Sequence, residues 1–68
     1  MKTYLLQAPE DRIDGGIYKG YILQVVSSRS GNEPDVTEVK EAMRRAGLSK
    51  RAESWAAPSN WIIKELKL

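Results

Sequence analysis

The N-terminal part of the chain alternates between apolar and polar positions with the period of two that is typical of β-strands. In residues 2–8, Tyr4 and Leu6 fall on one face and Leu5 falls on the other. Pro9 ends this strand, because proline cannot donate to a strand ladder. Residues 14–16 (Asp-Gly-Gly) are a hairpin turn signal, since glycine accepts the positive φ that tight turns require. We therefore expect a strand that leads into an antiparallel hairpin.

The second strand of this hairpin is predicted to extend from Ile17 to about Ser27. Apolar residues occupy both of its faces: Tyr21, Leu23 and Val25 on one, Ile22 and Val26 on the other. A strand that is apolar on both faces is typical of the centre of a sheet that is covered on each side. Gly20, inside this run, indicates a bulge or a bend.

A polar loop over residues 28–34 precedes the clearest helix signal in the chain. Asp35 and Glu38 have the spacing of a capping box, in which each side chain accepts a hydrogen bond from the other's backbone N–H. Apolar residues then recur at spacings of three and four, which is one face of a helix: Val36, Val39, Met43 and Ala46, with Ala42 beside them. Gly47 follows at the position that often turns left-handed. We predict an amphipathic helix between Asp35 and Gly47.

The C-terminal third predicts a short helix and a last strand. Ser49 is placed to cap a helix over roughly Lys50–Ala57, which Pro58 ends. Residues 61–66 read as a strand, with Ile62 and Leu66 facing opposite to Trp61 and Ile63.

These elements predict an α+β fold in the order ββα(α)β. A strand–helix–strand crossover that joins neighbouring parallel strands is right-handed in nearly all known cases. We therefore expect a three-stranded mixed sheet, made of a β-hairpin and a helix crossover to the C-terminal strand, with the main helix on one face. The second face of this sheet is then poorly covered in a monomer.

Length and composition limit how such a domain is stabilised. The chain has 68 residues, so we expect one domain over residues 1–68, and Met1 favours a complete chain. Domains of this size have small net stability and are often supported by disulfides, metals or oligomerisation. With no cysteine and no histidine, disulfides and zinc are excluded. A well-packed core, or a homodimer that completes the core, remains.

The same sequence favours a cytoplasmic protein. No run of about 18 apolar residues exists, so nothing is expected to span a membrane. The apolar block after Lys2 is shorter than the core of a signal peptide.

Candidate catalytic chemistry is scarce. The lack of histidine and cysteine removes the commonest general base, the commonest nucleophile and the usual zinc ligands. The hydroxyl groups in residues 27–30 have no evident base beside them. Glu10, Asp11 and Asp14 could hold a hard cation through oxygen ligands, but their spacing matches no calcium loop. We expect no enzyme activity, no cofactor and no metal site, and we rank an enzyme that uses carboxylates and a divalent metal last.

The net charge of +2 is small, but basic residues gather in one segment: Lys40, Arg44, Arg45, Lys50 and Arg51. The helix, glycine turn and second helix in this segment resemble a helix-turn-helix, whose second helix enters the major groove. Met43 stands where that motif has a small residue, and the second helix is short. These basic residues could also bind phosphates without reading bases, or an acidic protein surface. Nucleic-acid binding through Lys40 to Arg51 is therefore an alternative function.

The aromatic residues point to contacts with another molecule. Tryptophan fills space in small cores, and it is also enriched at interfaces. We expect Trp61 in the core, and Trp55 in the core or at an interface. Tyr18 and Tyr21 fall on opposite faces of the second strand, so at least one should point outward.

The leading hypothesis is a small non-catalytic protein-binding module, a regulator or inhibitor that occludes a surface of a larger protein. Three observations motivate it: few catalytic side chains, nearly balanced charge, and more aromatic residues than one thin core needs. The predicted contact residues are Arg44, Arg45, Lys50, Arg51 and Trp55.

Overall fold

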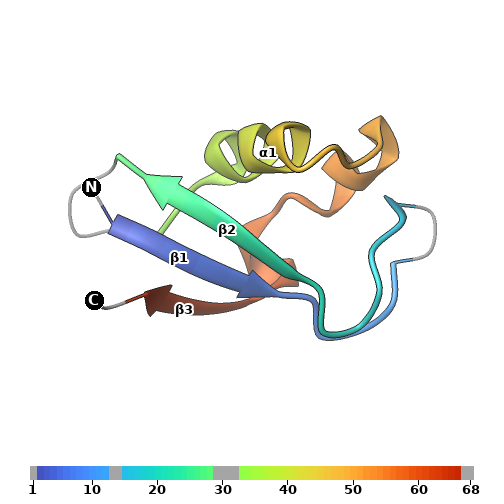
Figure 1. Ribbon diagram of the computed structural model, residues 1–68, viewed down its shortest axis with the longest axis horizontal. Coiled ribbons are helices and arrows are strands. Elements are labelled where there is room, and N and C mark those ends of the chain that lie inside the picture. The colour runs from blue at the N-terminus through green and yellow to red at the C-terminus, as the bar shows by residue number, and fades with distance from the viewer. Residues whose placement is uncertain (1, 13–14, 29–32, 67–68) are drawn as a thin grey trace.

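The computed structural model describes residues 2–12, 15–28 and 33–66 of the chain. Within them, three strands, one α-helix and two 3-10 helices (written η) follow the order ββα(α)β of the predicted α+β fold (Figure 1). Their bounds are β1 Lys2–Gln7, β2 Ile22–Ser27, α1 Val36–Arg45, η2 Lys50–Trp55, η3 Pro58–Asn60 and β3 Ile62–Leu66. None of the helices in the described ranges is long and apolar enough to cross a bilayer.

The sheet has the strand order β2-β1-β3, and both outer strands run antiparallel to β1. The predicted hairpin is confirmed, with Leu6 opposite Leu23. The prediction of a mixed sheet is wrong. β2 and β3 run in the same direction, but β1 lies between them, so the crossover through α1 joins the two edges and not two neighbours. The prediction of a central second strand is also wrong, because β1 occupies the centre.

The connection from β1 to β2 contains the distortion predicted at Gly20. Gly20 has φ +88° in a turn closed by the Tyr21 N–H on the Tyr18 carbonyl at 2.9 Å, a position that requires positive φ. Ala8 accepts from the Gly20 N–H and donates to the Tyr21 carbonyl, so two residues face one in a β-bulge. The regular strand therefore begins at Ile22, later than predicted.

The tip of this connection folds back onto η2. Ile17 and Arg12 pair in an isolated bridge, and Ile17 is fully buried. Gly15 lies so close to η2 that an added Cβ would meet the Ala52 Cα at 3.0 Å. The remaining residue of the predicted turn, Asp14, lies outside the described residues.

Both predicted ends of α1 are confirmed. The Glu38 N–H donates to Asp35 at 2.9 Å and the Asp35 N–H donates to Glu38 at 3.2 Å, which is the capping box. At the other end Gly47 has φ +80°, and its N–H donates to the Arg44 carbonyl. The Leu48 N–H reaches the Met43 carbonyl at 3.0 Å, which completes a Schellman motif.

The predicted second helix is present as the 3-10 helix η2, and a separate 3-10 turn, η3, follows it. η2 ends at Trp55, and Pro58 begins η3 instead of closing one longer helix. Ser49 occupies the N-cap position, but its side chain makes no capping hydrogen bond. Proline fits the first turn of a helix because that turn's N–H groups lack intrahelical acceptors. The segment thus packs its alanines inward through short, tight turns.

The core lies between the sheet and the helical layer. α1 contributes Val39, Ala42 and Met43, while the 3-10 segment contributes Ala52 and Ala56. Among the strand positions predicted to share one face, Tyr21 is only partly buried. The others are buried, as is the predicted core residue Trp61: Tyr4, Leu6, Leu23, Val25 and Trp61. Tyr18 is 67% exposed, which confirms that at least one of the two strand tyrosines points outward.

Candidate functional site

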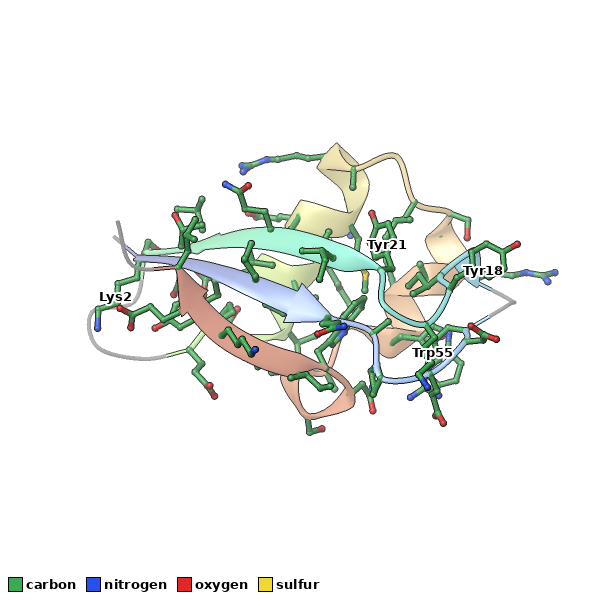
Figure 2. The ribbon with its side chains drawn as sticks, turned by 60° about the horizontal axis from the view of Figure 1, so that its bottom comes forward. Lys2, Tyr18, Tyr21 and Trp55 are labelled. Atoms are coloured by element: carbon green, nitrogen blue, oxygen red, sulfur yellow. The ribbon has the colours of Figure 1, made fainter. Side chains whose placement is uncertain are left out.

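The face of the sheet opposite α1 carries a two-dimensional array of nine side chains. Strand register places these residues in three rows across β2, β1 and β3. In Figure 2 the strands lie in front of α1, so this face is turned toward the viewer. The rows are Val26–Thr3–Leu66, Gln24–Leu5–Lys64 and Ile22–Gln7–Ile62. We call these nine residues the open face.

The open face is unusually apolar for a surface in contact with water. Six large hydrophobic residues are exposed among the described residues, and four of them are on this face. Their exposed fractions are Ile22 50%, Ile62 47%, Val26 45% and Leu66 36%. Half-buried Leu5 lies at the centre of the array and joins the two apolar rows. Exposed apolar patches of this kind often mark interaction sites.

Charge on the open face is limited to one cation. Lys64 is the only charged member of the nine. The nearest ion pair on the strands, Lys2–Glu65 at 3.5 Å, belongs to the opposite face by the alternation of the strands. A molecule that covers the open face therefore meets apolar and uncharged polar side chains and a single ammonium group.

The predicted basic contact residues lie at the junction of α1 and η2, away from the open face. Arg44 reaches Glu53 with two hydrogen bonds, at 3.0 and 3.4 Å. Hydrogen bonding between these two side chains raises the pKa of Arg44 and lowers the pKa of Glu53. Arg45, Lys50 and Arg51 are exposed. One of the predicted contact residues is therefore engaged within the protein, and three present their side chains to solvent.

Trp55, the fifth predicted contact residue, has a packing role at the hairpin end of the molecule (Figure 2). The Arg12 guanidinium lies 4.2 Å from the centre of the indole ring, a cation–π arrangement. Gly15 approaches the same ring, and the Trp55 carbonyl accepts from the Trp61 indole N–H at 2.7 Å. The Trp55 side chain is only partly exposed. This tryptophan connects the hairpin tip to η2.

The arrangement of α1 and η2 departs from a helix-turn-helix. η2 is a six-residue 3-10 helix, and its Ala52 is buried in the core. A recognition helix needs an exposed face several turns long to lie in the major groove. η2 is too short to provide that face.

Ser27 and Glu38 form a hydroxyl–carboxylate pair that sequence analysis missed. The Ser27 hydroxyl donates to Glu38 at 3.2 Å, and the Ser28 N–H donates to the same carboxylate at 2.9 Å. Burial raises the pKa of Glu38, but the hydrogen bonds from Ser28, Asp35 and Ser27 outweigh it, so the pKa lies below its usual value. A lowered pKa makes a poorer general base, and Ser27 is 0% exposed. The pair joins β2 to α1.

Metal-binding side chains do not gather in the described ranges. No group of three acidic residues there could hold an ion. The Asp11 carboxylate instead accepts the Lys19 N–H at 2.7 Å, and Glu10 pairs with Arg12 at 3.0 Å.

Comparison with known proteins adds no relative: no protein-family model matches the chain, and neither do any curated proteins or solved structures.

Sequence analysis anticipated an uncovered second face but did not choose it as the contact surface. The signal was present, because a single helix cannot cover two apolar sheet faces. Alternation along each strand specifies which residues share a face, but how they assemble into one array depended on the strand order, and the predicted order differed from the one found.

Proposed function

We propose that the protein is a non-catalytic protein-binding module whose contact surface is the open face. In this role it acts as a regulator or inhibitor that occludes a surface of a larger protein. The supporting observation is the exposure of Ile22, Val26, Ile62 and Leu66 on one uncovered sheet face.

Covering these side chains is favourable. Full burial of a valine, leucine or isoleucine side chain is worth about 1.5–3 kcal/mol relative to full exposure. The four residues retain between 36% and 50% of their exposure, so each contributes about 1 kcal/mol when covered. This energy is available without unfolding any part of the described structure.

A larger protein fits the open face better than a second copy does. Two copies would each bring Lys64 to the interface and no acidic residue from this face, whereas a different protein can place a carboxylate opposite the lysine. A stable interface uses about 20–30 residues a side, more than nine. A second copy presents the same nine residues, whereas a concave surface on a larger protein can also reach the residues around the open face.

A pair of matched substitutions tests this proposal. Ile62→Glu places a charge on the open face, and Val36→Glu makes a comparable change at a residue that is 42% exposed at the start of α1. Proteins captured by the wild type from extracts of the producing cells are purified, and their affinities are measured by isothermal titration calorimetry. We expect Ile62→Glu to weaken binding at least about tenfold and Val36→Glu to bind like the wild type.

Circular dichroism verifies that both variants are folded before binding is compared. Equal binding by Ile62→Glu and the wild type contradicts the proposal. A wild-type dimer that dissociates on Ile62→Glu, seen by analytical ultracentrifugation, assigns the face to a second copy and also contradicts it.

Nucleic-acid binding is the second candidate, favoured by the exposure of Arg45, Lys50 and Arg51 at one end of the molecule. A titration with duplex DNA and with RNA at several salt concentrations tests it. Phosphate contacts make log K fall with log salt, by about 0.9 per neutralised phosphate on duplex DNA. The absence of binding at low salt would exclude this function.

A further inference from the structure

The outer edge of β2 is an unprotected strand edge. β2 ends the sheet on one side, and no described strand pairs with its outer edge. Its six residues, Ile-Leu-Gln-Val-Val-Ser, include no charge, no proline and no glycine. Natural proteins usually protect edges with charged residues, proline, a bulge within the strand, or cover. The opposite edge strand, β3, follows that rule with Lys64 and Glu65.

The bulge at Gly20 determines which backbone groups of β2 face outward. Ala8 exchanges hydrogen bonds with the residue pair 20–21, so this pair points its groups inward. Hydrogen-bonded positions alternate along an antiparallel ladder. Leu23 and Val25 therefore also face β1, and the N–H and C=O groups of Ile22, Gln24 and Val26 face the outer edge.

A hollow of about 710 Å³ runs beside this edge, between β2 and α1. Ala42 and Ala46 form part of its helical wall, and their small side chains leave room for those of a ligand. Glu41 and Arg45 also lie on the helical wall, and Tyr21 and Ile22 lie on the strand wall. The outward backbone groups and the hollow thus belong to one groove, which we call the edge groove.

Charge is separated along the edge groove. Ser28, just past the end of β2, donates to Glu38 in the first turn of α1, so the start of the helix lies beside the end of the strand. Figure 1 shows α1 running opposite to β2. The groove therefore has carboxylates (Glu38, Glu41) near the C-terminal end of β2 and Arg45 near its N-terminal end.

We infer that the edge groove binds an extended peptide segment of a protein partner, which adds to β2 as a fourth, antiparallel strand. The backbone of the segment pairs with Ile22, Gln24 and Val26, and alternate side chains enter the hollow against Ala42 and Ala46. An antiparallel segment places its N-terminal end beside Glu41 and its C-terminal end beside Arg45. A basic residue at the first end and an acidic residue at the second complement these charges. The inference rests on the proposed function, since it presumes a protein ligand.

Proline at position 24 tests the backbone pairing. Gln24→Pro removes an N–H that faces outward and leaves the hydrogen bonds to β1 intact, as prolines on edge strands do. Gln24→Thr is the matched control, because it changes the same side chain and keeps the N–H. Each protein is screened against a displayed library of random octapeptides with free carboxyl termini, and selected peptides are synthesised and titrated.

We expect selected peptides to bind the wild type and Gln24→Thr equally, and Gln24→Pro at least tenfold more weakly. Titration of ¹⁵N-labelled wild type should move the amide resonances of Ile22, Gln24 and Val26 most. If Gln24→Pro is unfolded by circular dichroism, Ala46→Trp replaces it, since an indole there fills the hollow and should weaken binding to the same degree.

Three results overturn the inference. The first is a library that yields no binder, and the second is a selected peptide that binds Gln24→Pro, or Ala46→Trp where it replaces Gln24→Pro, as tightly as the wild type. The third is a wild-type dimer that Gln24→Pro dissociates, which would assign the edge to a second copy. Ile62→Glu separates the two proposals. This substitution on the open face should leave peptide binding unchanged. Failure of the open-face proposal and failure of the edge-groove proposal therefore give different results.

Discussion

Glu38 joins the end of β2 to the start of α1, and replacing it with alanine tests that junction. Its carboxylate accepts hydrogen bonds from the Ser28 N–H at 2.9 Å, the Asp35 N–H at 3.2 Å and the Ser27 hydroxyl at 3.2 Å. Loss of the capping contact costs about 1 kcal/mol. The two serine bonds, discounted for partial exposure, together add about 1 kcal/mol. We expect Glu38→Ala to lower the free energy of unfolding by about 2 kcal/mol.

The matched control is Glu41→Ala, which makes the same chemical change at an exposed position of the same helix. Urea denaturation near neutral pH measures the free energy of unfolding of both variants. We expect the control to change by less than about 0.5 kcal/mol. If Glu38→Ala loses no more stability than Glu41→Ala, the junction does not contribute as the structure indicates.

The lowered pKa of Glu38 adds a pH dependence to this prediction. Burial raises the pKa, but the hydrogen bonds outweigh it, so the folded pKa lies below the ordinary value of 4.5. Such a carboxyl contributes stability that is present above its unfolded pKa and is lost as the pH falls through the folded pKa. The stability gap between wild type and Glu38→Ala should therefore be full near neutral pH and shrink as the pH falls below the ordinary value of 4.5 and through the folded pKa. A gap that stays constant through this range contradicts the assignment.

Three further substitutions test the packing. Gly15→Ala brings a Cβ to 3.0 Å from the Ala52 Cα, so we expect urea denaturation to show a loss of about 1–3 kcal/mol, and unchanged stability would contradict the close contact. Trp61→Phe removes the indole N–H that donates to the Trp55 carbonyl at 2.7 Å, and thermal unfolding should show a loss of about 1–2 kcal/mol beyond that of a volume-matched change. Gly47→Ala keeps φ +80° with no atom within 4 Å of the new Cβ, so backbone strain alone should lower stability by about 1 kcal/mol; a stabilising effect would mean that the left-handed end of α1 is not maintained.

The parts of the fold that depend on local chemistry were predictable from the sequence. The capping box of Asp35 and Glu38 and the left-handed Gly47 are determined within a few residues, and both ends of α1 follow from them. The inward face of β1 also follows from alternation, because Tyr4 and Leu6 must share a side. These features require no knowledge of distant partners.

The strand pairing was not predictable in the same way. The alternation of Ile62 and Ile63 is compatible with either neighbour, since it specifies faces and not partners. The crossover rule gives the handedness of a connection between strands that end up adjacent, and it does not decide which strands are adjacent. Here β3 pairs with the free side of β1 and leaves the outer edge of β2 open. The apolar residues on both faces of β2 therefore indicated an uncovered face and not a central position.

The candidate surface shows the same division. The sequence revealed the basic segment from Lys40 to Arg51 but not that Arg44 pairs with Glu53, because this ion pair depends on how η2 turns back toward α1. It also left the position of Trp55 open, and the stack with Arg12 requires the hairpin tip to reach η2. Contacts between distant segments therefore decided which predicted residues remain available to a partner.

Methyl cross-saturation NMR on the complex with a purified partner tests the open face most directly. Irradiating the unlabelled partner should attenuate the methyl signals of Ile22, Val26, Ile62 and Leu66, while those of buried Leu6 and Val39 should keep their intensity. Attenuation centred on the segment 50–55, with the four open-face residues unaffected, would contradict the account.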